Sequence, residues 1–367
     1  MSRHPIRPCH RLLALACLGW AAAAHGQALG PDPQAPAEPP PAQVGAQVPA
    51  AVAGATRGYR YYAAGDLQAA TPQAPGFGLM LMGGGDYVED AFRWFAERAG
   101  HGHVVVLRAS GSDDLQHEFY DRLDAVASVE TFVFERREAA SDPFMLAAVA
   151  RADGIFIAGG DQARYIRYWK GTPLNAALDR HVREGKPLGG TSAGLAILGS
   201  ASYGALDGGS IDSLRALTNP LGDAVTLDDD FLHLPFLSRV VTDSHFGARD
   251  RLGRLVTFLA RAEHDGLVER PIGIGVDENT ALCIDSDGIG RVYSESNGHA
   301  WLVRARGSGQ ALSPDAPLTT GKVSVTLAGA DSRIDLATFH VEAPVFDTMA
   351  AVRDGELDLD EPLPEMR

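Results

Sequence analysis

Five residues near the middle of the chain, Gly190 to Gly194, have the pattern Gly-x-Ser-x-Gly. An apolar run precedes them and a buried helix is predicted from Leu195 onward, so the pattern would form a tight turn between a strand and a helix. Glycine at both ends leaves room for a strained turn that presents the hydroxyl of Ser192 above the sheet. The N–H of Ala193, at the helix N-terminus, would point to where an oxyanion forms. The pattern indicates nucleophilic acyl transfer, and an ordinary turn in which Ser192 caps the helix is the alternative.

A serine hydroxyl is a weak nucleophile and needs a base that is itself oriented by a third group. His245 is the best candidate for the base because it follows a predicted strand in a polar segment. His233 lies in a Gly-rich excursion and His264 on a predicted solvated turn, although His245 could also be only a capping residue. Glu278 or Asp277 could orient the imidazole, and adjacent side chains of a strand point to opposite faces, so we expect only one of them to do so.

The segment that carries the serine alternates apolar strands with helices. Strands are predicted at 77–82, 103–107, 129–134, 154–158 and before Gly190, and helices at 91–96, 119–123, 144–150, 165–169 and 174–184. Such a pattern predicts a mostly parallel sheet covered by helices on both faces, with ligands beyond the carboxyl ends of its strands. We therefore expect the glycines at 83–85, 159–160 and 189–190 to meet at one edge. No G-x-G-x-x-G pattern or Walker lysine follows residues 83–85, so close backbone approach is favoured there over nucleotide binding.

The second half of the chain has a different pattern. Residues 200–235 are polar and Gly-rich, which is typical of an excursion at the rim of a cleft. Strands are predicted at 236–241, 272–276 and 281–284, with a basic helix after His245 that contains Arg249, Arg251 and Arg254. Antiparallel strands are predicted at 291–294, 300–304, 323–327 and 334–339, followed by a solvated acidic tail.

Composition and the N-terminus restrict the class of protein. The net charge of −15 argues against a nucleic-acid partner and a membrane-surface role. Residues 1–26 combine a basic start, a short apolar run and small residues, which is typical of a secretory signal peptide, and residues 27–56 are a Pro/Ala-rich spacer. We therefore expect an exported protein, periplasmic or extracellular, that has no membrane association after cleavage. Of the three cysteines, Cys283 lies alone in an apolar strand and is expected to be a buried structural thiol.

Four motifs in order give the chain a family resemblance. They are Gly159-Gly160-Asp161-Gln162, the Ser192 pentapeptide, the segment from Asp243 through His245 to Arg254, and Gly273-Ile274-Gly275-Val276-Asp277-Glu278. Over roughly residues 77–285 the chain resembles the cyanophycinase and dipeptidase E family of serine peptidases. The resemblance implies a sheet similar to that of class I glutamine amidotransferases, in a catalytic domain at 57–289. Residues 290–367 would be a β-rich antiparallel extension with an acidic tail.

The resemblance also implies a site. Ser192 would be the nucleophile, His245 the general base and then acid, and Glu278 the orienting carboxylate. The N–H groups of Ala193 and Gly160 would form the oxyanion hole. The residues that the resemblance assigns to substrate binding are Asp161, Gln162, Asp243, Ser244, Arg249, Arg251 and Arg254. It implies no metal or organic cofactor, a peptide substrate with an aspartyl or β-aspartyl linkage, and a homodimer.

Two features of this site keep more than one function open. Arg251 and Arg254 share a face of the predicted helix and Arg249 points elsewhere, so at least one arginine is expected to be structural. Cyanophycinases carry glutamine before the histidine where this chain has Ser244, so the choice between cyanophycin and smaller aspartyl peptides stays open. The alternatives are a dipeptidase E-like enzyme and a non-catalytic binding protein of the same fold. An α/β-hydrolase esterase is disfavoured because its acid precedes its histidine.

Overall fold

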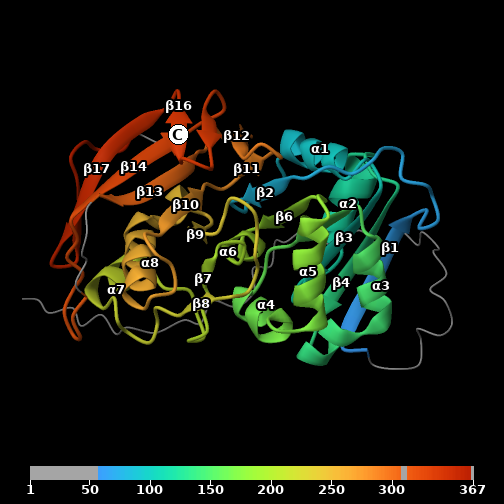
Figure 1. Ribbon diagram of the computed structural model, residues 1–367, viewed down its shortest axis with the longest axis horizontal. Coiled ribbons are helices and arrows are strands. Elements are labelled where there is room, and N and C mark those ends of the chain that lie inside the picture. Colours follow the sequence, from blue (N-terminus) through green and yellow to red (C-terminus); the bar gives the residue numbers. More distant parts are fainter. Residues whose placement is uncertain (1–56, 307–311, 365–367) are drawn as a thin grey trace, which may run out of the picture. The chain divides into compact units, whose positions relative to one another are not determined.

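The computed structural model describes residues 57–306 and 312–364 (Figure 1). The predicted signal peptide and spacer lie outside these residues. None of its helices is both long enough and apolar enough to cross a bilayer.

A ten-stranded sheet contains the predicted parallel strands. Its parallel centre runs in the order β4 (Ser128–Phe134), β3 (His103–Arg108), β5 (Gly154–Ile157), β6 (Leu188–Thr191) and β2 (Leu79–Met82). Antiparallel strands extend it on both sides: β1 (Tyr59–Gly65) beside β4, and β11 (Thr280–Ile284), β12 (Ile289–Ser294), β15 (Arg333–Asp335) and β16 (His340–Glu342) beyond β2. The α/β class and the antiparallel C-terminal strands are as the sequence predicts.

Helices cover both faces of this sheet. One face packs on α1 (Glu89–Arg98), α2 (Asp114–His117) and the π-helical turn Glu118–Arg122; the other packs on the 3₁₀ turn Arg137–Ser141, α3 (Pro143–Arg151), α4 (Gln162–Trp169) and α5 (Pro173–Arg183). The strands are buried on both sides because successive residues alternate between the two cores: Met80 joins the α1 core and Leu81 the α5 core. This explains why the strands read as continuous apolar runs.

A second sheet of eight strands holds the rest of the site. Its order is β18 (Glu356–Leu359), β17 (Phe346–Arg353), β14 (Lys322–Ala328), β13 (Ala300–Arg306), β10 (Ile272–Val276), β9 (Val240–Asp243), β7 (Ala201–Tyr203) and β8 (Leu227–Asp229). Only β9 pairs in parallel, with β7 and β10. Helices α7 (Ser213–Thr218) and α8 (Leu252–His264) pack on one face of this sheet.

Three local predictions are wrong. The residues at 281–284, expected to continue the strand that starts at Ile272, do not do so: the chain leaves β10 and crosses at residues 277–279 into β11 of the other sheet. The basic helix begins at Leu252, because Asp250 is left-handed at φ 47° and interrupts it. The acidic tail is not wholly solvated, since Leu357 and Leu359 pack on the core beneath α8 and make Glu356–Leu359 an edge strand.

The strands after residue 290 join both sheets. β15 and β16 extend the first sheet, whereas β13 pairs with β10 of the second. The predicted boundary between a catalytic domain ending at 289 and an extension starting at 290 stays a prediction. Strands after residue 290 pair with strands before it in both sheets.

Candidate active site

The turn between β6 and α6 (Ala193–Ala196) holds Ser192 in an unusual backbone conformation. Its φ of 53° and ψ of −114° are rare for a residue with a side chain. A Cβ at Gly190 would lie 2.6 Å from the carbonyl oxygen of Gly194, and one at Gly194 would lie 2.2 Å from that of Ile157. Both contacts are with backbone, so neither glycine can be replaced without moving the chain. The predicted strained turn, with glycine needed at both ends, is confirmed.

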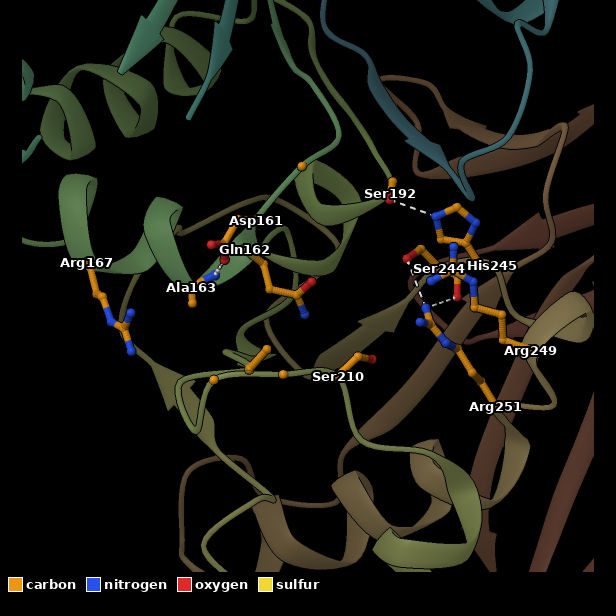
Figure 2. A pocket seen from close by; sticks show the side chains of 14 residues that line it. Asp161, Gln162, Ala163, Arg167, Ser192, Ser210, Ser244, His245, Arg249 and Arg251 are labelled. Carbon is orange, nitrogen blue, oxygen red and sulfur yellow. Dashed lines mark hydrogen bonds between the residues drawn. The ribbon is translucent and has the colours of Figure 1, made fainter. Parts of the chain in front are cut away.

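Ser192, His245 and Glu278 are joined by two hydrogen bonds. The Ser192 Oγ lies 2.7 Å from His245 Nε2 (Figure 2), and His245 Nδ1 lies 2.5 Å from Glu278 Oε1. An ionised carboxylate only accepts hydrogen bonds, so Nδ1 donates and Nε2 is left as the acceptor for the serine hydroxyl. The arrangement can remove a proton from Ser192 as its oxygen attacks a carbonyl carbon.

The imidazole of His245 is held by the glycines at 83–85. The backbone N–H of His245 donates to the Gly83 carbonyl at 2.7 Å, and the backbone N–H of Asn279 donates to the Gly84 carbonyl at 2.8 Å. A Cβ at Gly84 would lie 2.4 Å from the imidazole Cε1. The predicted close approach at these glycines is therefore confirmed, and its partner is the histidine ring. Asn279 is a contributor that the sequence reasoning missed, and no motif marked it.

The adjacent acids Asp277 and Glu278 divide as expected. The buried Asp277 carboxylate accepts from the backbone N–H groups of Gly247 and His299 and from the indole N–H of Trp301, at 2.8–2.9 Å. These three bonds fix the crossing between β10 and β11. Glu278, which follows at the crossing, is left to contact the imidazole.

Burial makes His245 a weaker base than a histidine in water but keeps it neutral at pH 7. Desolvation lowers the pKa of His245 below its ordinary value of 6.5, and the charges of Arg249 and Arg251 lower it further. The hydrogen bond that His245 donates to Glu278 opposes this shift. The imidazole thus carries a free lone pair at neutral pH, as a general base requires.

A cavity of about 390 Å³ opens beside Ser192 (Figure 2). Among the residues that the sequence predicts for the site, the ones that line it are Ser192, His245, Gly160, Asp161, Gln162, Ser244, Arg249 and Arg251. Arg249 belongs to the 3₁₀ turn Gly247–Arg249, half exposed, with its Nε 4.0 Å from Glu278 Oε1. Arg251 precedes α8 and is buried; its Nη1 donates to the Ser244 carbonyl at 2.6 Å. Burial lowers the pKa of Arg251 to about 10.

Asp243 and Arg254 lie behind the cavity wall and do not line it. Arg254 Nε donates to Asp243 Oδ2 at 2.7 Å and Nη2 donates to Oδ1. The remaining donor, Nη1, binds the Ser210 hydroxyl and the Ile211 carbonyl, both at 2.8 Å. Every nitrogen of this buried guanidinium therefore has a partner in the protein. Both residues tie β9 to α8 and to the loop before α7, as expected of at least one arginine, and their assignment to substrate contact stays a prediction that this geometry does not favour.

The backbone opposite Ser192 is the turn at Gly159 and Gly160. A Cβ at Gly159 would lie 3.3 Å from the Ser192 Cβ, so the turn packs directly on the serine. Tyr165 supports it by donating to the carbonyls of Ala158 and Gly159 at 2.8 and 2.9 Å. The Asp161 carboxylate caps the N-terminus of α4 by accepting from the backbone N–H of Ala163. The Gln162 side-chain amide donates to the Tyr203 carbonyl.

Sequence reasoning missed part of the cavity lining. Arg167 of α4 lies on the side of the cavity opposite to Arg249 and Arg251 in Figure 2, and it donates to the Leu206 carbonyl at 2.9 Å. Ala205 and residues 208–210 also line the cavity. They belong to the Gly-rich segment 200–235, which the sequence predicts at the rim of a cleft without naming these residues. Helical spacing from Gln162 could not have indicated Arg167, because residues five positions apart on a helix point about 140° apart. Within the described residues no three His, Cys, Asp or Glu side chains are grouped to hold a metal ion.

Comparisons with known proteins agree with the motifs. Residues 79–292 match the model of peptidase family S51. The cyanophycinase of Synechococcus elongatus is 35% identical over 234 residues, which cover 60% of this chain and 66% of that protein. The cyanophycinase of Trichormus variabilis is 29% identical over 232 residues, covering 60% and 72%. A solved peptidase from an acI-B1 actinobacterium is 19% identical with a TM-score of 0.47, covering 62% of this chain and 91% of that one.

The family match extends over more than half of the chain and contains Ser192, His245 and Glu278. It also contains the other motifs that carry the resemblance. The chain belongs to peptidase family S51.

Proposed function

We propose that this chain is a serine peptidase that hydrolyses peptides at aspartyl or β-aspartyl residues through an acyl-enzyme on Ser192. The observation that carries the proposal is the pair of hydrogen bonds from Ser192 to His245 and from His245 to Glu278. A non-catalytic binding protein would gain support if the serine lay far from the histidine. The 2.7 Å separation of their atoms counts against that alternative.

In this mechanism the Ser192 oxygen attacks the scissile carbonyl carbon while its proton passes to His245 Nε2. The N–H groups of Ala193 and Gly160 would donate to the oxyanion. The C–N bond then breaks and the imidazolium returns the proton to the leaving amine. Water attacks the resulting ester with His245 again as base, which releases the acid and restores the serine hydroxyl.

The substrate class follows from the family and from the charge of the cavity. The named relatives are cyanophycinases, and the chain spans 66% of the length of the first of them. Arg249 and Arg251 on one side and Arg167 on the other favour substrates with free carboxylates. The cavity of about 390 Å³ is the size of a pocket for a small ligand, and this favours a second candidate, an aspartyl dipeptidase.

Export and dimer formation are also proposals. The basic and apolar pattern of residues 1–26 supports export to the periplasm or beyond. N-terminal sequencing of the protein from its native host is the test, with a start at Gln27 expected. A homodimer is supported by the family resemblance alone, and sedimentation equilibrium tests it.

The experiment is hydrolysis of purified cyanophycin and of aspartyl and isoaspartyl dipeptides by the mature protein. We expect release of β-Asp-Arg, and a loss of at least about 10³-fold for Ser192→Ala. Ser200→Ala is the matched control because Ser200 lies shortly after α6 and its hydroxyl only donates to the Val240 carbonyl. Cleavage of dipeptides alone would select the second candidate, and equal activity of Ser192→Ala would refute the mechanism.

A further inference from the structure

A second cavity lies at the other end of the strands that carry His245 and Glu278. Its volume is about 470 Å³. Ile272 starts β10 and pairs with Val240 of β9 on one side and with Arg304 of β13 on the other. The site residues follow the opposite ends of β9 and β10, about 15 Å away along strands of this length. The second cavity is therefore separate from the one beside Ser192.

Three arginines and one acid line this cavity. The arginines are Arg239, Arg270 and Arg304, and the acid is Glu263. Arg239 Nη2 donates to the Arg270 carbonyl at 2.6 Å, which brings the two residues together. The Arg270 guanidinium forms an ion pair with its exposed neighbour Glu269, at 3.5 Å. The lining side chains thus carry an excess of two positive charges, in a protein whose net charge is −15.

Among the three arginines of this lining, Arg304 has the least compensated charge. Its Nε is buried and has no hydrogen-bond partner, and the described residues offer it no ion pair within 4.0 Å. Burial lowers the pKa of Arg304, and the nearby charge of Arg306 lowers it further; Asp347 opposes both. A partly buried cation without a partner is costly, and an anion in the cavity would remove that cost.

We propose that this cavity binds a small organic dianion that carries carboxylate or phosphate groups. Guanidinium groups bind such oxyanions in bidentate geometry, and a dianion balances the excess charge of the lining. Ile272 and Phe339 in the same lining provide an apolar contact for the carbon part of the ligand. The site is independent of the proposed peptidase activity, because no residue is shared with the cavity beside Ser192.

The test is calorimetric titration of the mature protein with succinate and with inorganic phosphate, at constant ionic strength. We expect at least one probe to bind with a dissociation constant below about 10 mM, and Arg304→Met to weaken binding at least tenfold. Binding of succinate alone would indicate a carboxylate ligand, and binding of phosphate alone would indicate a phosphate ligand. Arg353→Met is the matched control, because Arg353 is exposed, pairs with Asp358 and lies outside the cavity. No binding of either probe, or equal binding by Arg304→Met, would overturn the proposal.

A second measurement separates binding from a structural role. In buffer without multivalent anions, Arg304→Met should unfold at the same urea concentration as the wild type or at a higher one. Added ligand should raise the midpoint of the wild type and leave that of Arg304→Met unchanged. A lower midpoint of the variant without ligand would mean that Arg304 stabilises the fold by itself, contrary to the proposal.

Discussion

Arg254 on α8 is buried and Arg304 on β13 is partly buried, and their charges are met in different ways. The Arg254 guanidinium forms a bidentate pair with Asp243 and also binds Ser210 and Ile211. Arg304 has neither an ion pair nor a hydrogen bond for its Nε within the described part of the chain. One arginine is satisfied inside the protein, and the other is open toward a cavity.

The difference teaches which arginines are available to ligands. A guanidinium whose donors are all used cannot bind a substrate carboxylate without breaking its own contacts. Arg249, which is half exposed and 4.0 Å from the nearest Glu278 oxygen, keeps its donors available in the cavity beside Ser192. Replacement of each arginine by methionine, which keeps much of the side-chain volume, measures this contrast as a free energy of unfolding.

The largest effect is expected for Arg254→Met. The substitution leaves Asp243 buried, at 2% exposed, without its bidentate partner, and removal of one member of a buried pair costs about 3–5 kcal/mol. Urea unfolding followed by circular dichroism measures the loss. Adding Asp243→Asn to Arg254→Met should recover part of it, because the stranded charge is removed. A loss below about 1 kcal/mol for the single variant would show that the pair is not a structural support.

An intermediate effect is expected for Arg251→Met. Its Nη1 donates to the Ser244 carbonyl at 2.6 Å, while Asp243 keeps its bidentate bond to Arg254. The substitution also removes longer contacts of Nη1 with Asp243 Oδ1 and the Ser244 hydroxyl, both at 3.4 Å. It leaves no charge without a partner, so we expect a loss of about 1–2 kcal/mol of unfolding free energy. The same urea titration tests this, and a loss equal to that of Arg254→Met would contradict the order.

The catalytic motif could be predicted from sequence because its constraints are local. Gly190 and Gly194 are required by backbone contacts within one turn, and the short pattern around Ser192 records that requirement directly. His245 could be chosen because it follows a predicted strand end, whereas the same argument left Asp277 and Glu278 both open and the family resemblance selected Glu278. Neither assignment needed knowledge of which strands are neighbours.

The arginines and the sheet connections could not be predicted in this way. The role of Arg254 depends on Asp243 and Ser210, which are distant in sequence and meet only in the folded chain. Helical spacing placed Arg249 on the same helix as Arg254, but the left-handed Asp250 interrupts that helix. The crossing from β10 to β11 was missed for a similar reason. Asp277 fixes it through bonds to His299 and Trp301, which lie more than twenty residues later.

The smallest effect is expected for Arg249→Gln, and it concerns pH rather than stability. The charge of Arg249 lowers the pKa of His245, so its removal should raise that pKa. The general base is then protonated at a higher pH, and the acidic limb of the kcat/KM profile should move toward higher pH. Arg249→Lys keeps the charge and should keep the limb near its wild-type position, even if substrate affinity falls in both variants. A limb that stays fixed in Arg249→Gln, or moves equally in Arg249→Lys, would mean that the charge of Arg249 does not act on the imidazole.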